Sequence, residues 1–188
     1  ALPALLHFGS WVGGDMDGNP NVSGTTIRQS LEYHRREIIK KYLPEMGSLS
    51  RFLSQSLSEV KVSEEVLDRL ESYIELLPEE AGKIGQRVRN MPYRCLLKLM
   101  IVRMQGVGHG APGAYLNAQE FRADLELIRQ SLEMNKGKHA GSFLLNRLQV
   151  REKTFGFHLA TLDIRQDSLV HREVIAQIPV SYTHLRAH

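Results

Sequence analysis

Residues 8–22 read FGSWVGGDMDGNPNV, and this stretch decides the fold at the start of the chain. Its first part, Phe8–Val12, is apolar and aromatic and predicts a buried strand. Four glycines and one proline between Phe8 and Pro20 exclude a continuing helix or strand and predict a tight, irregular loop to about Val22. A loop of this kind brings carboxylates and backbone N–H groups close to a small ligand.

The same order of elements returns near the end of the chain. Alternation of apolar side chains predicts a second buried strand over residues 159–164, with Arg165 at its C-terminal end. Asp167 or Ser168 then caps a helix that runs to about Ile178. A strand that leads into a polar loop and a helix is the local pattern of an α/β barrel, in which ligand groups lie at the C-terminal ends of the strands.

Between these two segments the apolar spacing is helical. Two strands cannot close a barrel, so we predict a mostly α-helical fragment of an α/β (TIM-like) barrel, with two short strands each followed by a loop and a helix. The first helix is weakened at Pro44 and Gly47 before its pattern resumes. Helices are expected over residues 23–53, 63–77, 92–104, 117–137 and 142–153.

The bulk composition excludes several classes of protein. The 188 residues are 42% hydrophobic and 24% charged, with a net charge of +3, which is ordinary for a globular domain. The basic pairs Arg35-Arg36 and Lys40-Lys41 fall within a helical pattern and predict a solvated helix face, so we expect no nucleic-acid partner. The single cysteine, Cys95, lies among leucines and predicts a buried, inert thiol. No signal peptide or membrane-spanning run is evident, which favours the cytoplasm.

Arg165 is the strongest candidate for ligand binding, because a guanidinium matches phosphate and carboxylate oxygens with two parallel hydrogen bonds. A structural ion pair with a nearby acid is the alternative. Trp11 is the only tryptophan, and on sequence alone it either packs in the core at the strand end or lines a site.

Asp15 and Asp17 could bind a metal, hold the loop or pair with an arginine. A calcium loop is excluded, because Pro20 stands at the sixth position from Asp15 where glycine is needed, and Thr26 at the twelfth where glutamate is needed. We expect both carboxylates to accept hydrogen bonds from loop N–H groups. Five histidines show no metal-ligand spacing: His7, His34, His109, His139 and His158. No Ser-His-Asp or Cys-His arrangement can be argued.

The ends of the chain suggest the domain limits. The chain enters the first loop within ten residues, and the last eight fit no neighbouring element. We expect one partial barrel domain over residues 1–180, incomplete at both ends, and a non-native, adapter-derived tail over residues 181–188.

The loop of residues 8–22, together with LDIRQDS at residues 162–168 and His171, resembles two signature segments of the phosphoenolpyruvate carboxylases. The resemblance implies a fragment of a carbon–carbon lyase that carboxylates phosphoenolpyruvate with bicarbonate to oxaloacetate and phosphate. Such enzymes fix carbon dioxide, supply the tricarboxylic acid cycle, need Mg²⁺ or Mn²⁺, and are typically homotetramers.

The resemblance also implies roles for individual residues. Arg165 would contact the substrate phosphate, and Trp11 would line the carbon dioxide pocket. The family usually carries arginine where this chain has Met16, which removes a cation from the loop. Residues that support the loop would be Gly13, Gly14, Asp15, Asp17 and Asn19. Residues that support the second segment would be Gln166, Asp167 and His171.

The rest of the family's machinery is expected outside this sequence. The catalytic histidine would lie upstream, and the catalytic lysine, the metal-binding acids and a mobile glycine-rich loop downstream. No catalytic or metal-binding residue is therefore expected within the fragment, and the isolated chain is predicted to be inactive. Two alternatives stay open: a non-catalytic helical interaction module on the same scaffold, or another phosphoenolpyruvate-handling barrel enzyme.

Overall fold

The computed structural model describes residues 6–56, 61–135 and 141–177. Contacts divide the chain into two units, and each is described by itself. We call His34–Leu159 the helical unit, and Phe8–Tyr33 together with residues 160–177 the strand unit. The long helix α1, Gly24–Phe52, begins in the strand unit and continues into the helical unit.

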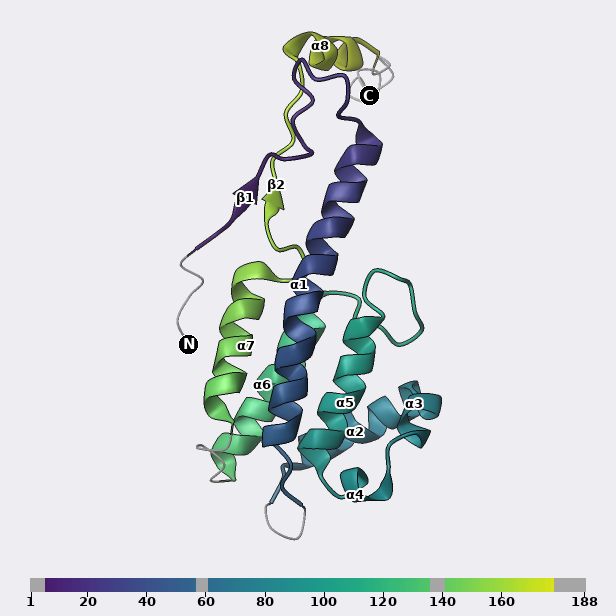
Figure 1. The fold of residues 1–188 in the computed structure, drawn as a ribbon, viewed down its shortest axis with the longest axis vertical. Coiled ribbons are helices and arrows are strands. Elements are labelled where there is room, and N and C mark those ends of the chain that lie inside the picture. Colours follow the sequence, from purple (N-terminus) through teal and green to yellow (C-terminus); the bar gives the residue numbers. More distant parts are fainter. Residues whose placement is uncertain (1–5, 57–60, 136–140, 178–188) are drawn as a thin grey trace, which may run out of the picture. The chain divides into compact units, whose positions relative to one another are not determined.

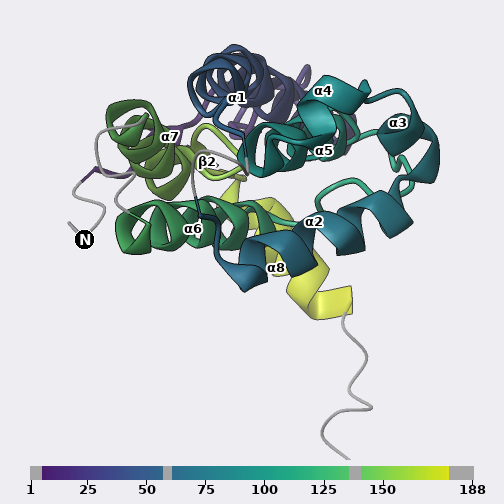
Figure 2. The same ribbon diagram turned by 90° about the horizontal axis from the view of Figure 1, so that it is seen from below.

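Six further helices follow α1 among the described residues of the helical unit. In Figures 1 and 2, α5, α6 and α7 lie beside the C-terminal part of α1. The helices are α2 (Glu64–Leu76), α3 (Pro78–Gly82), α4 (Gln86–Arg89), α5 (Pro92–Gln105), α6 (Ala118–Met134) and α7 (Ser142–Phe155). Proline stands at the first position of α3 and of α5, where its missing N–H has no intrahelical partner to lose.

Leucine, methionine and aromatic side chains form the core of the helical unit. Tyr42, Phe121, Tyr115 and Phe157 pack ring against ring, with centroids 5.5–6.5 Å apart. The Tyr42 hydroxyl donates to the carbonyl oxygen of Gly156 at 2.6 Å, so its polar group is satisfied. Cys95 is buried, as expected, and burial raises the pKa of its thiol.

A buried carboxylate joins three of these helices. Asp124 of α6 is fully buried and accepts hydrogen bonds from the hydroxyls of Tyr73 and Tyr115 at 2.5 and 2.6 Å. Arg69 of α2 donates to the same carboxylate at 2.6 Å, and Arg103 of α5 lies over the rings of Tyr73 and Tyr115. Burial raises the pKa of Asp124, and the two hydroxyls and the two arginines oppose that rise.

The strand unit contains one parallel pair. Strand β1 (Gly9–Ser10) pairs with β2 (Thr161–Leu162), with Gly9 opposite Thr161 and Ser10 opposite Leu162. A further bridge between Asp15 and Arg165 extends the pairing beyond both strands. Helix α8 (Ser168–Gln177) follows β2. Two short strands, each followed by a loop and a helix, are what the sequence predicted.

Both strands are shorter and more exposed than predicted. The expected strands at Phe8–Val12 and residues 159–164 reduce to two residues each. Trp11, Val12 and Ile164 are 57%, 73% and 59% exposed, so the prediction of buried strands was wrong. The physical reason is that regular pairing stops where the Gly13-Gly14 turn begins, and these apolar side chains are not covered by the described residues.

Helix α1 continues through the segment where weakening was expected. The residues Pro44 and Gly47 do not end the helix, which runs from Gly24 to Phe52. Leu31 is exposed, whereas Ile38 and Tyr42 are buried; the apolar face is therefore covered only in the helical unit. Among the described residues, no helix combines the length and apolar character needed to cross a membrane. Nothing in the structure tests the expected domain limits, and residues 181–188 lie outside the described part.

Candidate functional site

The candidate site lies where the loop after β1 meets the segment after β2. The Arg165 N–H donates to the Gly14 carbonyl oxygen at 3.0 Å, and the Met16 N–H donates to the Arg165 carbonyl oxygen at 2.9 Å. These two bonds form the Asp15–Arg165 bridge. They hold the backbone of Arg165 against the glycine-rich loop, on the side of the parallel pair where the strands end.

Two glycines allow this close approach. A Cβ atom on Gly14 would overlap the carbonyl oxygen of Asp163, which is backbone and cannot rotate away. Gly13 has a φ of 85°, a backbone conformation that residues with a side chain rarely adopt. A Cβ atom there would also overlap the Ser30 hydroxyl. The double glycine is therefore a steric requirement of the loop as it folds here.

Several loop N–H groups bond to acceptors within the loop. Ser10 Oγ accepts from the Val12 N–H at 3.3 Å, and Asn19 Oδ1 accepts from the Asn21 N–H at 3.0 Å. The supporting role expected of the two aspartates stays a prediction. Within the described residues, the buried Oδ1 atom of Asp15 has no hydrogen-bond partner. Asp17 is exposed.

The Arg165 side chain lies over Trp11. Its Cζ atom is 5.5 Å from the centroid of the indole ring, within the range of a cation–π contact. Neither side chain is buried. None of the ion pairs found among the described residues involves Arg165, so the alternative of a structural ion pair has no support there. Among the described residues, the arginine therefore contacts a neutral ring and makes no ion pair.

The residues after Arg165 order the following turn. Asp167 Oδ1 accepts from the Leu169 N–H at 2.7 Å, which caps α8 as predicted. Gln166 Oε1 accepts from the Asp167 N–H at 3.0 Å, and Gln166 Nε2 lies 3.9 Å from the sulfur of Met16. His171 lies exposed in the first turn of α8. Gln166 and Asp167 therefore shape the backbone that follows the loop contact.

The described residues do not form a metal site. They contain no group of three or more His, Cys, Asp or Glu side chains placed to share an ion. Asp15 offers one oxygen without a hydrogen-bond partner, and among the described residues it belongs to no such group. The metal implied by the resemblance is therefore not assigned to these residues.

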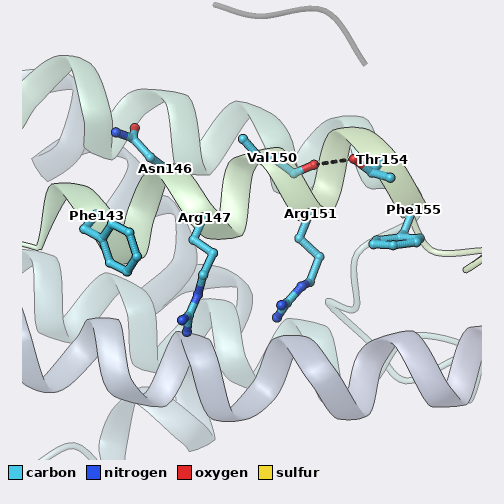
Figure 3. A pocket seen from close by; sticks show the side chains of 7 residues that line it. All are labelled: Phe143, Asn146, Arg147, Val150, Arg151, Thr154 and Phe155. Atoms are coloured by element: carbon cyan, nitrogen blue, oxygen red, sulfur yellow. Dashed lines mark hydrogen bonds between the residues drawn. The ribbon is translucent and has the colours of Figure 1, made fainter. Parts of the chain in front are cut away.

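A hollow lies on α7, in the helical unit, and has a volume of about 390 Å³. Figure 3 shows Arg147 and Arg151 extending toward the neighbouring helix, where both pair with Glu45 of α1. Phe143 and Val150 are exposed beside them. No residue that the sequence singled out lines this hollow, so it is separate from the candidate site.

Sequence reasoning missed several contributors. Ser10, Ser30 and Asp163 shape the loop through a hydroxyl acceptor and two close packing contacts, and nothing in their spacing marks them. Asp124 could have been found. It falls three residues after Phe121 on the apolar stripe of α6, where a charged residue must be paired if it is buried.

Comparison with known proteins gives a consistent result. The sequence matches the family model described as phosphoenolpyruvate carboxylase over residues 1–187. Proteins with the same name from Xanthomonas campestris pv. campestris and Xanthomonas oryzae pv. oryzae are 50% and 49% identical over 176 residues. One from Azorhizobium caulinodans is 34% identical over 197 residues. Each comparison covers 94% of this chain and 20% of the relative, so the chain spans about a fifth of their length.

Proposed function

Because the chain belongs to the phosphoenolpyruvate carboxylase family, we propose that it forms the part of such an enzyme that holds the phosphate of phosphoenolpyruvate. The observation that carries the proposal is Arg165. Its backbone is fixed by two hydrogen bonds to the signature loop, and its guanidinium has no ion pair among the described residues. A cation kept without a counter-ion beside a glycine-rich loop is suited to an anionic ligand.

The proposed reaction follows the family chemistry. Bicarbonate oxygen attacks the phosphorus of phosphoenolpyruvate, the enol oxygen leaves as an enolate, and carboxyphosphate forms. Carboxyphosphate releases carbon dioxide and phosphate, and the enolate carbon bonds to carbon dioxide to give oxaloacetate. Arg165 would hold the phosphate oxygens through both steps, where negative charge moves from one acceptor to the next.

Several features of the whole enzyme are part of the same proposal. We expect a TIM-like barrel completed by other segments, a homotetramer, a cytoplasmic location and a role in carbon dioxide fixation that supplies the tricarboxylic acid cycle. Mg²⁺ or Mn²⁺ would bind residues other than those described, since these do not fit it. We also propose that the 188-residue chain alone is inactive.

A segment exchange tests the proposal. Residues 6–177 of this chain would replace the matching segment of the Xanthomonas campestris relative, which is 50% identical, to give what we call the exchange enzyme. We expect the exchange enzyme to form oxaloacetate only when both phosphoenolpyruvate and bicarbonate are present, and the isolated chain to form none. Oxaloacetate is measured with a coupled malate dehydrogenase assay.

The other outcomes separate the alternatives. Phosphate release without a need for bicarbonate would favour another phosphoenolpyruvate-handling enzyme. A folded exchange enzyme that forms no oxaloacetate would favour a non-catalytic helical module.

A further inference from the structure

The contact between Trp11 and Arg165 joins the two signature segments through their side chains. The two residues belong to segments far apart in the sequence, and the parallel pairing of β1 with β2 brings them together. We infer that Trp11 is a positioning residue, which holds the Arg165 guanidinium by its face so that its N–H edge stays available to the substrate phosphate. The inference rests on the proposed function and adds a role for Trp11.

The geometry of a guanidinium makes the two contacts compatible. Its five N–H donors lie in the plane of the group, and a guanidinium that stacks on an aromatic ring contacts the ring through its own face. The Cζ atom of Arg165 lies 5.5 Å from the Trp11 ring, and the indole has the most favourable ring for such a contact. The indole can therefore hold the cation without using the hydrogen-bond donors that an anion needs.

The backbone of Arg165 is already fixed, so only its side chain still has to be ordered. Its N–H and carbonyl groups are both bonded to the loop, at 3.0 and 2.9 Å. A long, exposed arginine side chain otherwise samples many rotamers, and fixing them weakens anion binding. In the described residues Arg165 has no ion pair, so Trp11 is the group placed to restrict it.

This role differs in its consequences from a place in a carbon dioxide pocket. A residue that positions Arg165 affects the binding of phosphoenolpyruvate and leaves the dependence on bicarbonate unchanged. A residue that only lines the carbon dioxide pocket affects the second step, and so the use of bicarbonate or the fraction of released phosphate that is matched by oxaloacetate.

Fluorescence of the 188-residue chain gives the first test, because Trp11 is its single tryptophan. We expect phosphoenolpyruvate to change the Trp11 emission in a saturable way. The change should be lost in Arg165→Gln and kept in Arg172→Gln, a matched control that removes an exposed arginine of α8 in the same unit. Equal responses in the wild-type and Arg165→Gln chains, or no saturable response in the wild type, would overturn the inference.

Kinetics of the exchange enzyme give the second test. Trp11→Leu removes the π face and should raise the KM for phosphoenolpyruvate about two- to fivefold, whereas Trp11→Phe, which keeps a ring, should lie between Trp11→Leu and the wild type. The KM for bicarbonate and the ratio of oxaloacetate to phosphate should not change. A rise confined to the KM for bicarbonate would overturn the inference.

Arg165→Gln in the same enzyme separates the positioning role of Trp11 from the phosphate contact of Arg165. If Arg165→Gln raises the KM for phosphoenolpyruvate and both Trp11 variants leave it unchanged, the positioning role fails and the phosphate contact stands. If Arg165→Gln leaves that KM unchanged, the phosphate contact fails, and the positioning role fails with it. Should Trp11→Leu not fold, Trp11→Phe and the emission experiment still decide.

Discussion

At the scale of single residues, the site depends on a glycine without a Cβ atom and on an arginine without an ion pair among the described residues. Gly14 has no Cβ, and this lets the loop approach the backbone of Asp163 closely enough for the Asp15–Arg165 bridge to form. Arg165 has no ion pair among the described residues, which keeps a cation available for an anionic ligand. The two features are linked, because the bridge that Gly14 permits also fixes the backbone of Arg165.

Gly14→Ala should therefore disturb the site directly. The new methyl group overlaps a carbonyl oxygen, so the loop must move away from the segment after β2, at a cost of about 1–3 kcal/mol. We expect a lower free energy of unfolding in urea and weaker binding of phosphoenolpyruvate to the exchange enzyme.

Gly24→Ala is the matched control for this change. Gly24 has open space around its Cβ position and lies in the first turn of α1, so alanine there should be neutral or slightly stabilising. Equal losses of stability in the two variants would show that the close approach at Gly14 is not what constrains the loop.

At the scale of the elements, the sequence predicted the helices better than the strands. Apolar periodicity and local start signals marked both ends of α2, α5 and α7 and the start of α6, whereas α6 ends at Met134 instead of the expected residue 137. At the start of α6, Asn117 accepts from the Glu120 N–H at 3.0 Å. The strands could not be bounded in this way, since their pairing depends on a segment far away in the sequence.

The site shows the same contrast between local features, which the sequence predicted, and long-range contacts, which it did not. The two motifs were recognisable because each is contiguous, but the side-chain contact between Trp11 and Arg165 was not foreseen. A parallel register of Ser10 with Leu162 is needed to place the two side chains together, and no local pattern encodes that register.

The Asp124 network should be the main polar contribution to the packing of α2, α5 and α6. Asp124→Asn removes the charge that faces Arg69 and leaves too few acceptors for the surrounding donors, which should lower the free energy of unfolding by about 3 kcal/mol. Urea unfolding followed by circular dichroism measures the loss.

An exposed carboxylate of the same helix provides the comparison for Asp124. Glu133→Gln removes a surface ion pair with Arg129 and should change the stability by no more than about 0.5 kcal/mol. Losses of similar size in the two variants would contradict a structural role for the buried carboxylate.

The same network predicts a loss of stability in alkali. Burial, followed by the charge of Asp124, raises the pKa of Tyr73 to about 12, from an ordinary value of 10.0. Between these two values the folded chain keeps a proton that the unfolded chain loses, so stability present below pH 10 falls as the pH rises toward 12. Urea unfolding at a series of alkaline pH values measures the slope, and Tyr73→Phe should reduce it; an unchanged slope in that variant would be the contrary result.

At the scale of the whole molecule, this chain consists of a helical unit and a strand unit, and its relatives in the family are about five times longer. Its described residues include Arg165, which we propose binds the substrate phosphate, and contain no cluster of metal-ligating side chains. A division of this kind predicts that the segment controls the affinity for phosphoenolpyruvate, while other segments supply proton transfer and the metal.

The most direct measurement is the KM for phosphoenolpyruvate of the exchange enzyme with and without Arg165→Gln, at saturating bicarbonate. Loss of a charge-assisted contact of about 1.5–3 kcal/mol should raise this KM roughly ten- to a hundredfold. The KM for bicarbonate should be unchanged, and Arg172→Gln should leave both constants unchanged. An Arg165→Gln enzyme with the KM of the wild type for phosphoenolpyruvate would contradict the account.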